Sequence, residues 1–136
     1  MNTWVQIPQN SDFTIHNIPF GIFSINNSNK RVGIAIGDEV LDLVLAAKTG
    51  IFNDLNFDSS VFEADTLNDF ISLGKETTSK VRELIQQELG NENSVLKNDN
   101  NAFKLQKEVT MHLPISVGDY TDFYSSIEHA TNVGMM

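Results

Sequence analysis

The sequence predicts a small α+β domain that is mainly β. Between residues 21 and 43, short apolar runs alternate with turn-forming residues, as in an antiparallel meander. Between residues 66 and 89 the apolar residues recur at helical spacing instead. The chain has 136 residues, of which 40% are hydrophobic and 20% charged. That length and balance are sufficient to bury one core and unlike those of a disordered chain.

The N-terminal third is expected to form strands. Residues 1–20 should be an extended lead-in, because Pro8 and Pro19 exclude a helix there. In residues 31–36 the apolar side chains alternate onto one face, and the polar residues 26–30 before them are typical of a turn. The expected strands are residues 21–26, 31–36 and 39–43.

Helices are expected to follow the meander. The strongest candidate is 75–89, where Val81, Leu84, Ile85 and Leu89 form one apolar stripe and a glycine comes next. The polar residues 91–101 should form a loop, and residues 103–113 should be extended up to Pro114. The three expected helices are 43–47, 66–73 and 75–89.

Charge and composition exclude several classes of function. The net charge is −9 with a pI near 4.5, so the surface should repel nucleic-acid phosphates and anionic membranes. The chain has no cysteine, which excludes disulfides and thiolate metal sites. No segment approaches the roughly 20 apolar residues of a membrane helix, and no targeting segment is evident at the N-terminus. We therefore expect a soluble, cytoplasmic protein.

The stretch 119–129 is the part of the sequence that is richest in reactive side chains. It places Asp122 between Tyr120 and Tyr124 on one face of an extended segment, and His129 in the first turn of a helix after it. Carboxylates bind hard cations, phenols hold polar substrates, and imidazole moves protons. Taken singly, each residue also has a structural explanation: a solvated carboxylate, edge aromatics, or a hydrogen-bonded histidine. Spacing alone indicates an acid–base site with a hard metal, among these alternatives.

Other motifs favour structural roles. His16 and His112 are expected to be surface or hydrogen-bonded residues, because no second histidine or glutamate stands at a zinc-binding spacing. The glycines of Gly33–Gly37 lack the lysine and hydroxyl residue of a phosphate-binding loop.

The same terminal motif resembles the signature of the fumarylacetoacetase family. It reads GDYTDFYSS at 118–126 and EHATNVG at 128–134. The likeness extends upstream over most of the chain, in the segments SDFTIHNIPFGIFS at 11–24, VGIAIGDEVLDL at 32–43, TLNDFISLG at 66–74 and MHLPISVGDYTDFYSS at 111–126.

This resemblance implies a fold, a reaction and a set of roles. The family joins an SH3-like barrel with added helices, expected at residues 1–112, to a larger β-rich catalytic domain whose truncated start would be 113–136. The enzyme is a homodimer that hydrolyses the carbon–carbon bond of 4-fumarylacetoacetate, giving fumarate and acetoacetate in tyrosine and phenylalanine catabolism. By motif position, Asp122 resembles a ligand of Ca²⁺ or Mg²⁺, Tyr124 a substrate-binding residue, and His129 the catalytic base.

Two other functions remain open at this stage. A hard cation takes about six oxygen ligands, and the others would lie beyond Met136, so we expect this chain alone to be inactive. It is therefore interpreted as an N-terminal fragment. The first alternative is a non-catalytic SH3-like module for binding or dimerisation. The second is another enzyme of the same superfamily, a decarboxylase or a diketone or acylpyruvate hydrolase.

Overall fold

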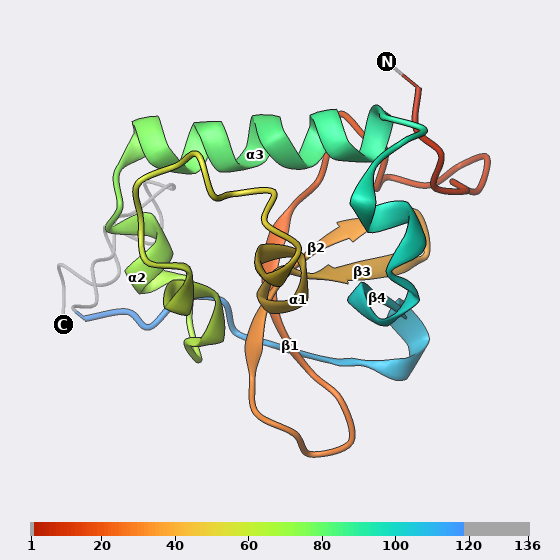
Figure 1. Cartoon of the computed structure of the whole chain (residues 1–136). Coiled ribbons are helices and arrows are strands. Elements are labelled where there is room, and N and C mark those ends of the chain that lie inside the picture. The colour runs from red at the N-terminus through yellow and green to blue at the C-terminus, as the bar shows by residue number, and fades with distance from the viewer. Residues whose placement is uncertain (1, 119–136) are drawn as a thin grey trace, which may run out of the picture.

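The computed structural model describes residues 2–118 and is organised on a five-stranded antiparallel sheet (Figure 1). The strand order is β4-β3-β2-β1-β5, so the last two strands of the chain form the two edges. The predicted class, an α+β and mainly β fold of the SH3-like kind, is confirmed. The strands are β1 (Phe20–Ser24), β2 (Arg31–Ile36), β3 (Glu39–Asp42), β4 (Phe103–Leu105) and β5 (Thr110–His112).

The predicted meander is present in β1, β2 and β3, and its turns explain its sequence. Asn26 and Asn27 lie in the turn between β1 and β2 with positive φ angles of 47° and 64°, a conformation that asparagine tolerates better than most residues. Gly37 connects β2 to β3 at a φ of +57°, and a Cβ there would lie 2.7 Å from the carbonyl oxygen of Gln6. This connection therefore requires glycine.

The two faces of the sheet are covered differently. On one face, side chains such as Ile22, Val32 and Leu41 are fully buried and belong to the main core, together with side chains of the helices. On the opposite face Gly21 pairs with Gly33, and Phe23 and Val40 lie against the space that a Cβ of Gly33 would fill. We call these the helix-covered face and the glycine face.

Three helices cover the first of these faces: α1 (Leu43–Lys48), α2 (Asn68–Ile71) and α3 (Lys75–Gly90). The long helix α3 runs across the sheet (Figure 1) and buries Val81, Ile85 and Leu89 completely. Leu84, predicted to share that stripe, is half-buried. The helix begins and ends within a residue of its predicted bounds.

Helix α1 begins at a buried carboxylate. Asp42 is 1% exposed, and its Oδ1 accepts hydrogen bonds from the backbone N–H groups of Val44, at 2.9 Å, and Leu45, at 3.4 Å. Its Oδ2 accepts a hydrogen bond from Arg31, at 2.6 Å. The buried charge is thus paired and also caps the helix.

Two expectations about the C-terminal half are wrong in detail. Residues 91–101 form two short 3₁₀ helices, Val95–Asn98 and Asn100–Ala102, instead of a loop, because Leu96 and Ala102 are fully buried in the core. Residues 103–113 are two strands instead of one extended segment. A third 3₁₀ helix, Gln106–Glu108, separates them, since the Gln106 backbone and side chain donate hydrogen bonds to the carbonyl groups of Asp38 and Gly37, both at 2.8 Å.

The remaining differences concern residues 59–73. A 3₁₀ helix, Ser59–Glu63, was not predicted; it is capped by Asp58 and buries Phe62. The helix expected at 66–73 is reduced to the four residues of α2. The backbone N–H of Leu67, the residue before α2, donates to the carbonyl oxygen of Pro114 at 2.7 Å. Gly74, at a φ of +94°, separates α2 from α3.

Candidate functional site

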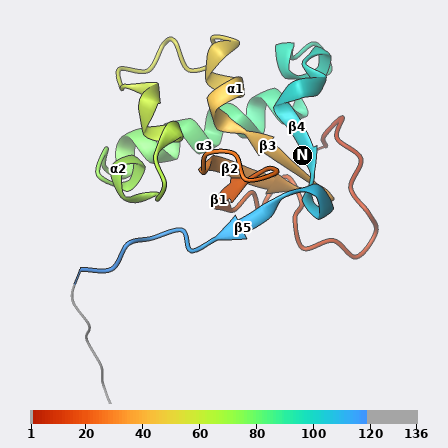
Figure 2. The same ribbon diagram turned by 90° about the horizontal axis from the view of Figure 1, so that it is seen from below.

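The residues that the sequence assigns to the chemistry, Asp122, Tyr124 and His129, lie outside the described residues. What the structure shows is the path by which the chain approaches them. After β5 the chain continues as residues 113–118, which we call the approach segment. It runs past β1 toward α2 (Figures 1 and 2).

Hydrogen bonds hold the approach segment against α2. The side-chain amide of Asn68 donates to the carbonyl oxygen of Ser116 at 3.0 Å and accepts from the backbone N–H of the same residue at 3.2 Å. Next to this pair lies the bond from the Leu67 N–H to the Pro114 carbonyl oxygen. We call the two bonds between Asn68 and Ser116 the Asn68 clip.

Apolar side chains of β5 and the approach segment are exposed. Every second residue from Met111 to Val117 is apolar, as in a strand with one buried face, yet the exposed fractions are large. They are 59% for Met111, 86% for Leu113, 50% for Ile115 and 75% for Val117. Residues 2–118 therefore hold this segment through polar contacts more than through burial.

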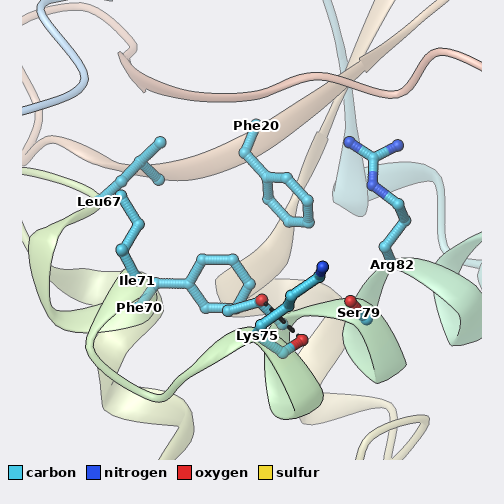
Figure 3. Close-up of a pocket in the computed structure, with 8 residues that line it drawn as sticks. Phe20, Leu67, Phe70, Ile71, Lys75, Ser79 and Arg82 are labelled. Carbon is cyan, nitrogen blue, oxygen red and sulfur yellow. Dashed lines mark hydrogen bonds between the residues drawn. The ribbon is translucent and has the colours of Figure 1, made fainter.

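A groove of about 430 Å³ lies between β1, α2 and α3 (Figure 3). Phe20, Leu67 and Phe70 are among its apolar lining residues, and the rings of Phe20 and Phe70 lie 5.0 Å apart. Lys75 and Arg82 of α3 line the same groove, and the Arg82 guanidinium carbon lies 5.6 Å from the centroid of the Phe20 ring. Such a surface suits a ligand group that is apolar with a negative charge at one end.

The two histidines of the described part of the chain have the roles that the sequence predicted. His16 is exposed. His112 of β5 is half-buried, and its Nε2 lies 2.8 Å from the hydroxyl oxygen of Ser24 in β1. This bond joins β5 to the sheet just before the approach segment begins.

The carboxylates of residues 2–118 do not form a metal centre: no three or more of the Asp, Glu and His side chains there are grouped so that they could hold an ion. Two of these carboxyls, Glu39 and Asp58, have shifted pKa values, each for its own reason. Burial raises the pKa of the Glu39 carboxyl, and the charge of Asp38 raises it further. The Ser60 N–H bond to Asp58 lowers the pKa of that exposed carboxyl.

Within the described part of the chain, none of the helices has both the length and the apolar character required to cross a membrane. The longest is α3, which has 16 residues and exposes a charged face.

Comparison with known proteins decides the family. The model of the family described as "Fumarylacetoacetase N-terminal" matches residues 16–114, nearly three quarters of the chain. The chain belongs to this family. The matched range starts in the lead-in before β1 and includes all five strands, the three helices and Pro114 of the approach segment.

Curated relatives extend the match over the whole chain. The fumarylacetoacetase of Caenorhabditis elegans is 44% identical over 141 aligned residues, covering 100% of this chain and 34% of the relative. That of Dictyostelium discoideum is 42% identical over 100% of this chain and 33% of its own length. The human fumarylacetoacetase is 41% identical over 98% of this chain and 33% of its own. The chain thus spans about a third of the length of these curated relatives.

Sequence reasoning missed two features of this surface. Asn68 was expected to be an ordinary residue of a longer helix, because an asparagine in a helical pattern gives no sign of a partner 48 positions away. Lys75 and Arg82 fall within the helix predicted at 75–89, for which the sequence singles out only the apolar stripe. Their spacing of seven residues, two turns of a helix, places them on one side of α3, but the sequence does not show that Phe20 lies beside them.

Proposed function

We propose that the chain is the N-terminal portion of a fumarylacetoacetase, a metal-dependent hydrolase that cleaves the carbon–carbon bond of 4-fumarylacetoacetate to fumarate and acetoacetate. One observation carries the proposal: the family match over residues 16–114, continued by relatives of that name at 41–44% identity over 98% or more of the chain. The aligned ranges of these relatives include the motif at 119–129, which lies outside the described structure.

We further propose a boundary between an SH3-like domain at 1–112 and the start of a catalytic domain at 113–136. The last strand of the sheet, β5, ends at His112. The apolar side chains that follow it are exposed, unlike most of those in β1, β2 and β3. Both observations favour a change of structural unit at this point.

In the proposed mechanism His129 is the general base. It takes a proton from a water molecule as the oxygen of that water attacks a carbonyl carbon of the diketone. Tyr124 holds the substrate by a hydrogen bond from its phenol. When the carbon–carbon bond breaks, its electron pair goes to the departing acetoacetate carbon as an enolate, which then gains a proton. A base with a pKa near neutrality suits this step, and unperturbed histidine has a pKa of about 6.5.

Asp122 would hold a divalent cation, Ca²⁺ or Mg²⁺, as one of about six oxygen ligands. Such a cation, when bound, withdraws electrons from a chelated diketone and offsets the charge of the enolate. A hard carboxylate oxygen is a suitable donor for either ion.

The same proposal extends to the location, oligomeric state and pathway of the whole enzyme. We propose that it is a cytoplasmic homodimer that acts on a small molecule in tyrosine and phenylalanine catabolism. The acidic balance of the chain, with 18 acidic residues against nine basic ones, supports a partner other than nucleic acid.

A non-catalytic SH3-like binding module is the second candidate. The groove between β1, α2 and α3 supports it, because an apolar floor with Lys75 and Arg82 beside it is a surface that a partner could use. Another diketone or acylpyruvate hydrolase of the superfamily is the third. The family match favours fumarylacetoacetase over both.

The deciding experiment is a chimera. This chain replaces the aligned third of the Caenorhabditis elegans fumarylacetoacetase, and hydrolysis of fumarylacetoacetate is followed by loss of its ultraviolet absorbance with Mg²⁺ or Ca²⁺ present. We expect the chimera to be active and the 136-residue chain alone to be inactive. His129→Ala should lower kcat of the chimera by about 10²- to 10⁴-fold, since that is the usual contribution of one general base.

His16→Ala is the matched control, because His16 is an exposed histidine of the same chain and should leave kcat unchanged. A folded chimera without activity would contradict the proposed function. Equal activity of the parent and the His129→Ala chimera would contradict the role given to that histidine.

A further inference from the structure

Asn68 connects the SH3-like domain to the segment that leads to the proposed catalytic residues. We propose that Asn68 is a positioning residue: its clip on Ser116 fixes the direction of the chain shortly before the residues proposed for the chemistry, Asp122, Tyr124 and His129. The link to catalysis rests on the proposed function, whereas the clip itself rests on the contacts of described residues.

The chemistry of the clip requires an amide. Asn68 meets both backbone groups of Ser116 at once, donating from Nδ2 and accepting at Oδ1, much as a neighbouring strand would. An aspartate could accept from the N–H but would face the Ser116 carbonyl oxygen without a donor. An alanine would lose both bonds. The pairing also fixes which end of the amide is oxygen, because the reverse assignment would oppose like groups.

The contacts around the clip support a built attachment. Two positions before Ser116, Pro114 accepts the hydrogen bond from the Leu67 N–H at 2.7 Å. The proline fixes its own φ and restricts the residue before it to extended conformations. The approach segment is therefore held at two alternate residues by two consecutive residues at the start of α2.

Within residues 2–118, apolar burial does not hold the approach segment in place. Leu113 and Val117, which flank the two held residues Pro114 and Ser116, are 86% and 75% exposed. Without apolar contacts of comparable extent, the direction of the segment depends on the hydrogen bonds to Leu67 and Asn68.

Ser116 is the closer of the two held residues to the proposed metal ligand. Asp122 stands six residues after Ser116 and eight after Pro114 in the sequence. Loss of the clip would therefore leave Pro114 as the nearest held residue before Asp122.

Amide hydrogen exchange on the 136-residue chain tests the clip directly. In Asn68→Ala we expect the Ser116 N–H to exchange about two- to tenfold faster, the range for one lost hydrogen bond, and the Leu67 N–H to follow. Asn68→Asp should lie between Asn68→Ala and the parent. Asp69→Ala, an exposed neighbour on the same helix, is the matched control and should change neither amide.

Ser116→Pro removes one of the two bonds of the clip from the other side and leaves the sequence of α2 unchanged, so it guards against unfolding of that helix in Asn68→Ala. It removes the donor of Ser116 and should speed exchange of the Leu67 N–H. Unchanged exchange of the Ser116 N–H in Asn68→Ala would overturn the clip, and unchanged exchange of the Leu67 N–H in both variants would overturn its support of the neighbouring bond.

The positioning role is tested in the chimera with Mg²⁺. Asn68→Ala should raise the Mg²⁺ concentration for half-maximal activity about twofold, the lower end of the range for a lost hydrogen bond, because the bond to Pro114 still holds the segment. The melting temperature should stay that of the Asp69→Ala control. A half-maximal concentration equal to that of the parent would overturn the positioning role. An inactive parent chimera would instead contradict the proposed function, and the exchange measurements would still report on the clip.

Discussion

The helix-covered face of the sheet and the approach segment share one sequence pattern but differ in structure. Both alternate apolar and other residues, as Val32, Ile34 and Ile36 do in β2 and as Leu113, Ile115 and Val117 do after β5. The first set is at most 1% exposed, whereas the second is at least 50% exposed. Alternation therefore predicts an extended backbone in both places, but burial in only one.

The difference shows two ways of fixing a chain segment. In the core, apolar burial determines the position of each strand and tolerates little change in volume. In the approach segment, an asparagine side chain and one backbone N–H determine the path, and the apolar side chains contribute little within residues 2–118. Truncation of an apolar side chain should therefore lower the unfolding free energy strongly in the core and only slightly in the approach segment.

The largest contrast is expected for large-to-small substitutions. Phe62 is fully buried, with ring centroids of Phe52 and Phe70 both 5.6 Å away. Phe62→Ala should lower the free energy of unfolding by about 3–5 kcal/mol, through lost apolar transfer and the cavity left behind. Leu113→Ala should change it by about 0.5 kcal/mol or less. Urea unfolding of the 136-residue chain measures both, and a comparable loss for Leu113→Ala would remove the contrast.

The fold was largely predictable from the sequence because its signals are local. Strand β2 matches its prediction residue for residue, and α3 does so within one residue at each end. The errors lie where contacts with residues distant in the sequence determine the secondary structure. Gln106, which divides the expected strand 103–113 in two, does so through bonds to carbonyl groups 68 and 69 positions away. No local pattern carries that information.

The glycines give the second contrast. A Cβ on Gly33 would lie 2.7 Å from Cε1 of Phe23 and 2.8 Å from Cγ1 of Val40, both buried side chains. Gly33→Ala should therefore cost about 1–3 kcal/mol of unfolding free energy, as overpacking does. Gly118→Ala, at the end of the approach segment, meets nothing within 4 Å and should be nearly neutral. If thermal unfolding shows the same stability for Gly33→Ala as for the parent, Phe23 and Val40 must move aside to accommodate the methyl group.

The candidate site was less predictable than the fold. Asp122, Tyr124 and His129 were selected from residue types and a family resemblance, and they stay predictions because they lie outside the described residues. The contact of Asn68 was not predicted because its partner is a backbone group, which no side-chain pattern can reveal. For this reason, sequence motifs do not identify residues that act by hydrogen bonding to the backbone.

The smallest effect concerns the charge of Glu39, the first residue of β3. Burial and the neighbouring Asp38 raise the pKa of Glu39, so over the window between the ordinary glutamate pKa, about 4.3, and the raised one, the folded chain binds more protons than the unfolded chain. Stability should therefore fall as pH rises through that window and remain lowered at neutral pH.

Glu39→Gln tests this directly, because it removes the charge and keeps nearly the same shape. It should raise the unfolding free energy at neutral pH by about 1 kcal/mol at most, since the partly exposed carboxylate is screened by solvent. At about pH 3, below the ordinary glutamate pKa, the carboxyl is protonated in both the folded and the unfolded parent, so the gain should vanish. Glu63→Gln, at an exposed position, is the control. Urea unfolding at both pH values measures the difference. A gain that persists unchanged at low pH would show that Glu39 is unfavourable for its shape or hydrogen bonding instead of its charge.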